Sequence, residues 1–297
     1  MDRRDNAPSG LILLHKQPGV TSFDALRDIK RALGTGKAGH TGTLDKFAEG
    51  LLLVLTGRAL KLSQWFTHCD KQYEGVMRFG AETDTLDPEG EVVAEAPIPT
   101  RGAVEAILAR FRGDIEQAPP AYSAIHIDGE RASALARCGD APAMRKRPVT
   151  VYQLELRSWE PPLARIFVHC SSGTYIRSLA RDIALAVESR AYLTALTRTR
   201  VAGFKLEDAV SVSGGQLAVS LIPINKFVFE RLNISCLDIA PADAAKIRNG
   251  KPLEPVLHNV LQNVIQNVIA LFSGDELIAV IERHNNEWNY GYVYARN

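Results

Sequence analysis

The segment Gly39–Gly50 combines three glycines with His40, two threonines and the carboxylate of Asp45. Glycines let a backbone turn tightly or approach a ligand closely. A carboxylate held by such a loop on a rigid scaffold can serve as a nucleophile or as a general acid or base. The same residues also suit an ordinary turn in which Asp45 caps the next helix. These twelve residues alone leave both interpretations open.

The whole chain has the size and composition of a globular protein of about two domains. It has 297 residues, 46% of them hydrophobic, and a formal net charge of +1. The charge is uneven, because residues 174–205 carry six basic residues against two acidic ones. A basic face suited to a nucleic acid is therefore compatible with the near-neutral total.

The four cysteines, Cys69, Cys138, Cys170 and Cys236, are far apart and form no CxxC pair. This spacing indicates neither a zinc site nor a disulfide framework, and it favours reduced thiols in a cytoplasmic protein. The apolar run Leu11–Leu14 is too short for a signal-peptide core, and no window approaches the roughly 20 apolar residues of a membrane helix. We expect a soluble protein without a membrane partner.

Hydrophobic periodicity predicts the elements that would hold the Gly39–Gly50 loop. Strands are predicted at Leu11–Leu14, Leu51–Leu55, Lys71–Phe79, Val149–Ser158 and Ala164–Cys170, and Tyr192–Thr199 completes this part of the chain without an assigned element. Helices are predicted at 22–33, Ala59–Phe66, Thr100–Phe111, Arg131–Arg137, from about Ser171 to Ser189, and at Ala242–Asn249. In the first of these helices, Ser22 is the predicted N-cap and Phe23 belongs to the predicted core stripe.

Two further segments suggest turns and one stays undecided. Asp84 and Asp87 are interpreted as residues of a hairpin turn rather than as a metal-binding pair. Leu271–Glu282 has the pattern of a hairpin. The near-repeat Asn259–Ile269 fits either a helix or a strand, because its apolar period of four conflicts with its poor helix formers.

Five segments in order resemble the TruB-type tRNA pseudouridine synthase family over about residues 11–205. They are Lys16–Ser22 (KQPGVTS), Gly39–Lys61 with its GHTGTLD and GRALK parts, Lys71–Asp87 with KQY and TDTLD, Phe111–Ile125 (FRGDIEQAPPAYSAI), and Gly173–Arg177 (GTYIR). The resemblance implies isomerisation of uridine to pseudouridine at position 55, in the TΨC loop of tRNA, with no cofactor and no metal.

The resemblance also implies roles for individual residues. Asp45 takes the position of the nucleophile, and Arg177 that of its arginine partner, which would lower the aspartate pKa. Tyr73 would stack on a uracil flipped out of the loop, and His40 would fill the space that the base leaves. Without the resemblance, Arg177 suits a solvated helix start and Tyr73 a half-buried strand position.

RNA contacts are implied for a second group of residues. The segment at about 118–148 resembles an RNA-clamping loop, whose cations would meet phosphates of the T arm. The residues implied are Tyr122, Ser123, Lys61, Arg131, Arg145, Lys146 and Arg147, with Leu196 on the floor of the site. Arg198 is expected to contribute packing rather than chemistry. No obligate protein partner is implied.

The chain departs from the family pattern at Lys46, where a proline is usual. Proline restricts the backbone of the preceding residue, so Asp45 loses a constraint. Lys46 also adds a positive charge beside Asp45, or a phosphate contact. His126, Ser133 and Ala184 replace a usual lysine, tyrosine and glycine; none of these changes removes a catalytic position, but they bear on RNA affinity.

We therefore predict an α/β (α+β) protein. A pseudouridine synthase catalytic domain with a mixed, mainly antiparallel sheet is expected at residues 1–230, and a small β-rich, PUA-like RNA-binding domain at 231–297. Two alternatives remain open: a non-catalytic tRNA-binding or tRNA-folding protein of the same fold, and a retaining glycosidase that uses Asp45 with Glu49.

Overall fold

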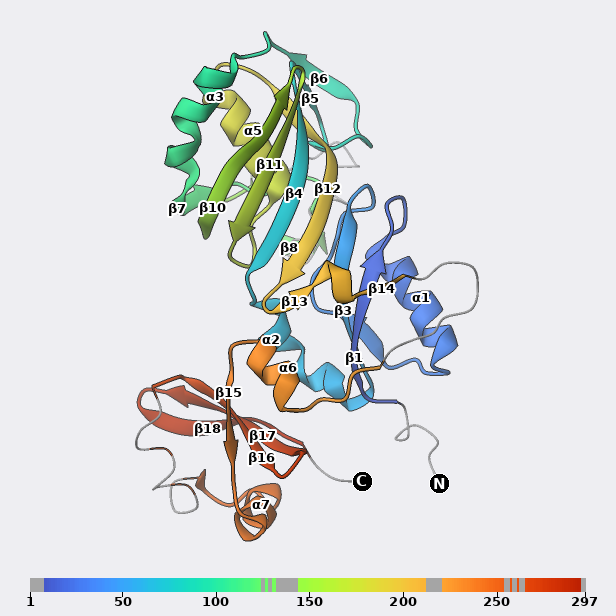
Figure 1. Cartoon of the computed structure of the whole chain (residues 1–297), viewed down its shortest axis with the longest axis vertical. Coiled ribbons are helices and arrows are strands. Elements are labelled where there is room, and N and C mark those ends of the chain that lie inside the picture. Colours follow the sequence, from blue (N-terminus) through green and yellow to red (C-terminus); the bar gives the residue numbers. More distant parts are fainter. Residues whose placement is uncertain are drawn as a thin grey trace.

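A computed structural model describes residues 8–123, 126–127, 130–131, 144–211, 221–253, 257, 261 and 265–294. Its largest sheet is elongated and has the order β14-β1-β3-β12-β4-β11-β10-β7, with β2 paired to β3 and β13 to β12 (Figure 1). These strands are β1 (Gly10–Lys16), β2 (Ala38–His40), β3 (Glu49–Thr56), β4 (Lys71–Phe79), β7 (Gly113–Gln117), β10 (Arg147–Glu160), β11 (Leu163–Cys170), β12 (Ala191–Val201), β13 (Phe204–Lys205) and β14 (Val210–Ser211). Only β1–β14 and β3–β12 pair in parallel among the described strands of this sheet, which confirms the mixed, mainly antiparallel prediction.

The remaining described strands form three smaller sheets. β5 (Ala81–Thr83) pairs with β6 (Val92–Glu95), and β8 (His126–Ile127) pairs with β9 (Glu130–Arg131). A separate C-terminal sheet contains β15 (Ser235–Asp238), β16 (Val268–Ser273), β17 (Glu276–His284) and β18 (Glu287–Val293). The predicted hairpins around Asp87 and within Leu271–Glu282 are confirmed by β5–β6 and β16–β17.

Short helices pack against the sheets, and the one at Pro241–Arg248 packs against β16 and β17 of the C-terminal sheet (Figure 1). They are α1 (Ser22–Ala32), α2 (Ser63–Thr67), α3 (Arg101–Ile107), α5 (Ile176–Leu185), α6 (Lys226–Arg231) and α7 (Pro241–Arg248), with 3-10 turns η1 (Gly57–Leu62), η2 (Leu108–Phe111) and η3 (Leu206–Asp208). Among the described residues, no helix is both long enough and apolar enough to cross a membrane.

The strand β4 shows how side-chain alternation positions the site. Its odd-numbered side chains, among them Tyr73, Met77 and Phe79, are buried in a cluster with residues of α5 and α3. Because successive strand residues point to opposite faces, the even-numbered ones lie on the other face of the sheet. The predicted strand Lys71–Phe79 is confirmed, and it fixes Tyr73 on the helix-covered face.

The strand β3 is buried on both faces. Leu52 and Val54 pack with α1, whereas Leu51, Leu53 and Leu55 pack in a cluster that reaches the C-terminal sheet. Such continuous burial explains its unbroken run of leucine and valine.

Gly50 allows β3 to approach β12 closely. It has φ 113°, and a Cβ there would lie 2.4 Å from the Arg198 carbonyl oxygen. Only glycine fits this backbone position.

Four sequence predictions need correction. The cap of α1 is Thr21, whose side chain accepts from the Asp24 N–H, while Ser22 is the first helical residue. Phe23, the second residue of the helix, is 72% exposed rather than in the core stripe, because it lies on the outer side of the helix, where the Lys30 ammonium is 6.0 Å from the centroid of its ring. The predicted helix Ala59–Phe66 divides into η1 and α2, and that at Thr100–Phe111 into α3 and η2.

The helix predicted to run to about Ser189 is also shorter than expected. α5 begins at Ile176 and ends at Leu185, and the chain then turns through Glu188, which has φ 55°. The structure leaves some of the predicted features undescribed. They are most of the helix predicted at 131–137 with Ser133, the thiol of Cys138, and most of the repeat at 259–269.

Candidate active site

A cleft of about 480 Å³ opens where the Thr41–Asp45 loop meets the ends of β4 and β12. Its lining includes the predicted residues Asp45, Tyr73, Tyr122, Ser123, Arg177 and Leu196. It also includes Thr41, Gly42, Thr43, Leu44, Thr67, Lys71, Gly173, Thr174, Tyr175, Ile176 and Arg198. Five segments far apart in the chain therefore converge on one cleft.

Arg177 lies at the centre of an arginine–carboxylate network. Its Nη2 donates to Asp45 Oδ1 at 2.9 Å, and its Nη1 lies 3.2 Å from Asp87 Oδ2. The Arg177 side chain is 5% exposed and that of Asp45 34%, so the arginine is buried while the carboxylate still reaches the cleft. Two further bonds, to the carbonyls of Thr85 and Tyr122, fix the guanidinium plane. Asp45 thus accepts a hydrogen bond from a guanidinium that its other acceptors hold in place.

Asp87 is more than the turn residue predicted from sequence. Its Oδ1 accepts from the Thr85 hydroxyl at 2.6 Å and from the Glu89 N–H at 3.0 Å, which are turn contacts. Its Oδ2 faces Arg177, and burial raises its pKa against the opposing effects of Thr85 and Arg177. The acidic segment TDTLD gave no local signal for this pairing, because the partner lies 90 residues away.

The loop that carries Asp45 is held from below by α1 and β1. The Ser22 hydroxyl donates to the Leu44 carbonyl and accepts from the Leu44 N–H, which explains why Ser22 is not the helix cap. The buried ammonium of Lys16 donates to the Ala48 carbonyl at 2.6 Å and lies 3.4 Å from that of Lys46. These bonds restrain the backbone on both sides of Asp45.

Arg198 was expected to contribute packing, and it instead holds the loop by hydrogen bonds. It is 2% exposed. Its guanidinium donates to the carbonyls of Leu51 at 2.7 Å, Gly42 at 3.1 Å and Thr43 at 3.4 Å. A buried guanidinium needs such acceptors, so Arg198 ties β3 and β12 to the Asp45 loop.

Tyr73 and Lys71 project from β4 into the same cleft. Burial raises the pKa of Tyr73 to about 12, so the phenol stays protonated at neutral pH. Burial, together with the nearby Arg198 charge, lowers the pKa of Lys71 to about 8. The Lys71 ammonium donates to the carbonyls of Cys69 at 2.6 Å and Thr67 at 3.1 Å.

The pKa of Lys71 predicts a rise of stability with pH. Between about 8 and its ordinary pKa of 10.5, the folded protein has released a proton that the unfolded chain still binds. The free energy of unfolding should therefore increase, by about 2 kcal/mol from this group between pH 8 and 9.5. Urea unfolding at both pH values measures it. The variant Lys71→Met should lose the part of the stability increase that comes from Lys71. It should retain the part that comes from Lys16, whose pKa burial also lowers to about 8. A stability increase equal to that of the wild type would contradict the lowered pKa of Lys71.

Lys46, at the position of the usual proline, forms an ion pair with Glu89 rather than with Asp45. Its ammonium lies 3.1 Å from Glu89 Oε1, in the turn that also carries Asp87. Its carbonyl accepts from the Gly19 N–H at 2.8 Å. The side chain therefore links the Asp45 loop to the turn that supports Arg177.

Loss of this link should have a small effect. Both side chains are about half exposed (53% and 43%), and exposed ion pairs contribute about 0–1 kcal/mol. Lys46→Ala is expected to change the free energy of unfolding by less than about 1 kcal/mol and the single-turnover rate by no more than about threefold. Glu89→Ala is the matched variant and should behave alike. A loss of activity approaching that of an Asp45 variant would show that Lys46 acts on the reaction directly.

The other predicted residues lie outside the cleft lining. His40 is in β2 beside Thr41; its buried Nδ1 has no hydrogen-bond partner among the described residues, and burial lowers its pKa. Lys61 is exposed in η1. Arg145, Lys146 and Arg147 are exposed where β10 begins, and the side chain of Arg131 is outside the described part.

The carboxylate expected to assist Asp45 in a glycosidase does not share the cleft. Glu49 Oε1 accepts from the Thr197 hydroxyl at 3.1 Å, and Glu49 is absent from the described residues that line the cleft. The paired-carboxylate arrangement of that alternative is therefore not supported. In the described part of the chain, no group of three or more His, Cys, Asp or Glu residues has a metal-binding arrangement.

Comparisons with known proteins identify relatives of this chain. Residues 30–176 match the model of the TruB family pseudouridylate synthase N-terminal domain. The tRNA pseudouridine synthase B of Borreliella burgdorferi (strain ZS7) is 46% identical over 204 residues, which are 68% of this chain and 72% of that relative. That of Azoarcus sp. (strain BH72) is 39% identical over 289 residues, 95% of this chain and 92% of the relative.

A solved structure shows the same fold. A chain in the crystal structure of a Cbf5-Nop10-Gar1 complex matches with a TM-score of 0.68 and 24% identity, covering 93% of this chain and 79% of that one. The match to the family model and the identity to relatives over most of their length show that the chain belongs to the TruB family of pseudouridylate synthases.

Proposed function

We propose that the protein isomerises uridine to pseudouridine at position 55, in the TΨC loop of tRNA. The observation that carries the proposal is the carboxylate of Asp45, held at 2.9 Å by the buried Arg177 at the edge of a cleft lined by Tyr73. The relatives named tRNA pseudouridine synthase B support tRNA as the substrate.

The reaction breaks the bond between ribose C1′ and uracil N1 and forms a bond between C1′ and C5. N1 gains a proton and C5 loses one, so that substrate and product are isomers. Asp45 in its ionised form acts on the ribose or the base as the nucleophile. Arg177 orients Asp45 through the Nη2 end of its guanidinium group. The Nη1 end of the same group pairs with Asp87.

The target base must leave the stack of the loop before it reaches Asp45. Tyr73 supplies an aromatic surface for the flipped uracil, and its phenol, with a pKa raised to about 12 by burial, can donate a hydrogen bond. His40 is expected to occupy the space left in the RNA. Arg145, Lys146 and Arg147, which are exposed at the start of β10, would contact phosphates of the T arm.

A tritium-release assay tests the proposal. Transfer RNA labelled with tritium at C5 of uridine should release tritium in the presence of the protein, and the same tRNA with cytidine at position 55 should release none from that site. Chemical mapping of pseudouridine in the product locates the modified position. Release that persists after the substitution at position 55 would overturn the T-loop assignment.

The non-catalytic alternative predicts tight tRNA binding without tritium release. It rested on the lysine in place of proline after Asp45. The pairing of Lys46 with Glu89 leaves the Asp45–Arg177 bond intact, which favours catalysis. The same assay distinguishes the two functions.

A further inference from the structure

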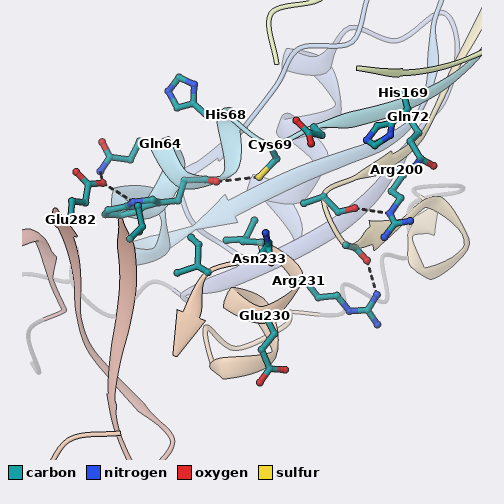
Figure 2. A pocket seen from close by; sticks show the side chains of 17 residues that line it. Gln64, His68, Cys69, Gln72, His169, Arg200, Glu230, Arg231, Asn233 and Glu282 are labelled. Carbon is teal, nitrogen blue, oxygen red and sulfur yellow. Dashed lines mark hydrogen bonds between the residues drawn. The ribbon is translucent and has the colours of Figure 1, made fainter. Parts of the chain in front are cut away.

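A second cleft, of about 840 Å³, lies between the main sheet and the C-terminal part (Figure 2). Its walls come from α2, the ends of β4, β11 and β12, the α6 region, and the strands β16 and β17. Thr67 and Lys71 line the active-site cleft, whereas residues 68–70 and Gln72 line the second cleft. One short segment therefore separates the two clefts.

Arg200 and Arg231 both donate hydrogen bonds to the turn at 202–203, which lines this cleft. Arg200 Nε donates to the Ala202 carbonyl, and Arg231 Nη1 donates to the Gly203 carbonyl, each at 2.6 Å. The turn lies close against α6, because a Cβ on Gly203 would lie 2.8 Å from the Arg231 carbonyl oxygen. Consecutive carbonyls thus gather two guanidinium groups on the same side of the cleft (Figure 2).

The carboxylates of this cleft do not neutralise the two arginines. Asp70 Oδ1 accepts from the Tyr152 hydroxyl at 3.2 Å, and Glu282 Oε1 accepts from Trp65 Nε1 at 2.8 Å on the opposite side of the cleft. Glu230 is exposed and points away from both arginines in Figure 2.

Within the described residues, neither Arg200 nor Arg231 forms an ion pair with a carboxylate. The Arg231 guanidinium also lies 4.9 Å from the centroid of the Phe227 ring, and both arginines are half-buried. Guanidinium groups stay charged at all accessible pH values, so two of them held at one turn form a positive patch that suits an anionic ligand.

We propose that Arg200 and Arg231 form a phosphate site that binds the sugar–phosphate backbone of the substrate tRNA, outside the active-site cleft. This proposal rests on tRNA as the substrate. The planar fork of arginine matches the oxygens of a phosphate. An RNA bound in the active-site cleft would bring further phosphates to the segment 67–72, which contributes residues to both clefts. The two arginines, one on β12 and one on α6, would then hold the tRNA across the junction of the catalytic and C-terminal parts.

The affinity for tRNA at several salt concentrations tests the site. The double variant Arg200→Gln/Arg231→Gln is expected to raise the Kd about tenfold and to reduce the slope of log K against log salt by about one or more, because each lost phosphate contact removes close to one unit. Arg101→Gln is the matched control. Arg101 is exposed on α3 and pairs with Glu105 at 2.8 Å. The helix α3 lies at the end of the main sheet that is remote from α2, α6 and the C-terminal sheet (Figure 1).

A Kd and a salt slope equal to those of Arg101→Gln would overturn the proposal. The single variants Arg200→Lys and Arg231→Lys keep the charge and should lie between wild type and the double variant, and they serve if the double variant does not fold. If inorganic phosphate stabilises the wild type but not the double variant while the tRNA affinities are equal, the site binds free phosphate and the RNA assignment is wrong. A wild type that releases no tritium would instead overturn the proposed function, because the affinity comparison does not depend on turnover.

Discussion

Asp45→Asn is expected to lower the single-turnover rate of pseudouridine formation by at least about 10⁴-fold, as loss of a nucleophile does in other enzymes. The amide has nearly the shape of the carboxylate, so the cleft and the tRNA affinity should stay within about twofold of wild type. It carries no negative charge, however, and it cannot form a bond to the ribose. Tritium release measured at saturating enzyme reports the rate, and filter binding reports the affinity.

Asp84→Asn is the matched control for this experiment. Asp84 Oδ1 accepts from the Glu91 N–H at 3.0 Å in the neighbouring turn, and its side chain does not contact Arg177 in the described structure. This variant should keep a rate close to wild type. Substantial turnover by Asp45→Asn would remove Asp45 from the role of nucleophile.

Arg177→Met is expected to lower both stability and turnover. The substitution leaves Asp87, whose side chain is 7% exposed, without its cation. Removing one partner of a buried pair costs about 3–5 kcal/mol. Turnover should fall by at least about 100-fold, since Asp45 loses the fork that orients it. Urea unfolding and single-turnover tritium release measure the two effects.

A second substitution separates stability from orientation. Arg177→Met/Asp87→Leu removes both buried charges, and replacement of a buried ion pair by apolar residues is often neutral for stability. The double variant should recover most of the lost free energy of unfolding and none of the lost rate. If the rate returned together with stability, Arg177 would serve the fold alone and not the orientation of Asp45.

Local patterns in the sequence were sufficient for β1, β3, β4, β10 and β11 of the main sheet, whereas β2, β7, β12, β13 and β14 were not assigned from the sequence. The alternation in Lys71–Phe79 and the continuous apolar run Leu51–Leu55 correctly predicted β4 and β3, because side-chain periodicity reports how many faces of a strand are buried. Helix ends were less predictable. Thr21 and Ser22 are both suitable caps, and the choice depends on the bond between Ser22 and Leu44, which lies 22 residues away.

Site residues that carry a motif were predicted, whereas their supports were not. Asp45, Tyr73 and Arg177 stand in the family segments, and the structure brings all three to one cleft. Asp87 stands in the TDTLD segment and Arg198 was expected to pack near the site, but their hydrogen-bond partners lie 90 and more than 140 residues away, so no spacing along the chain indicates these contacts.

By itself the sequence determined the family, the mixed sheet and the residues that meet in the cleft, because motifs and periodicity are local properties of the chain. Only the tertiary structure decided which acceptors hold the buried guanidinium of Arg177 and that of Arg198. It likewise directed Lys46 to Glu89 and placed Arg200 beside Arg231. A buried charge must find its partners wherever the folded backbone presents them, and folding brings together segments whose contacts no local pattern records.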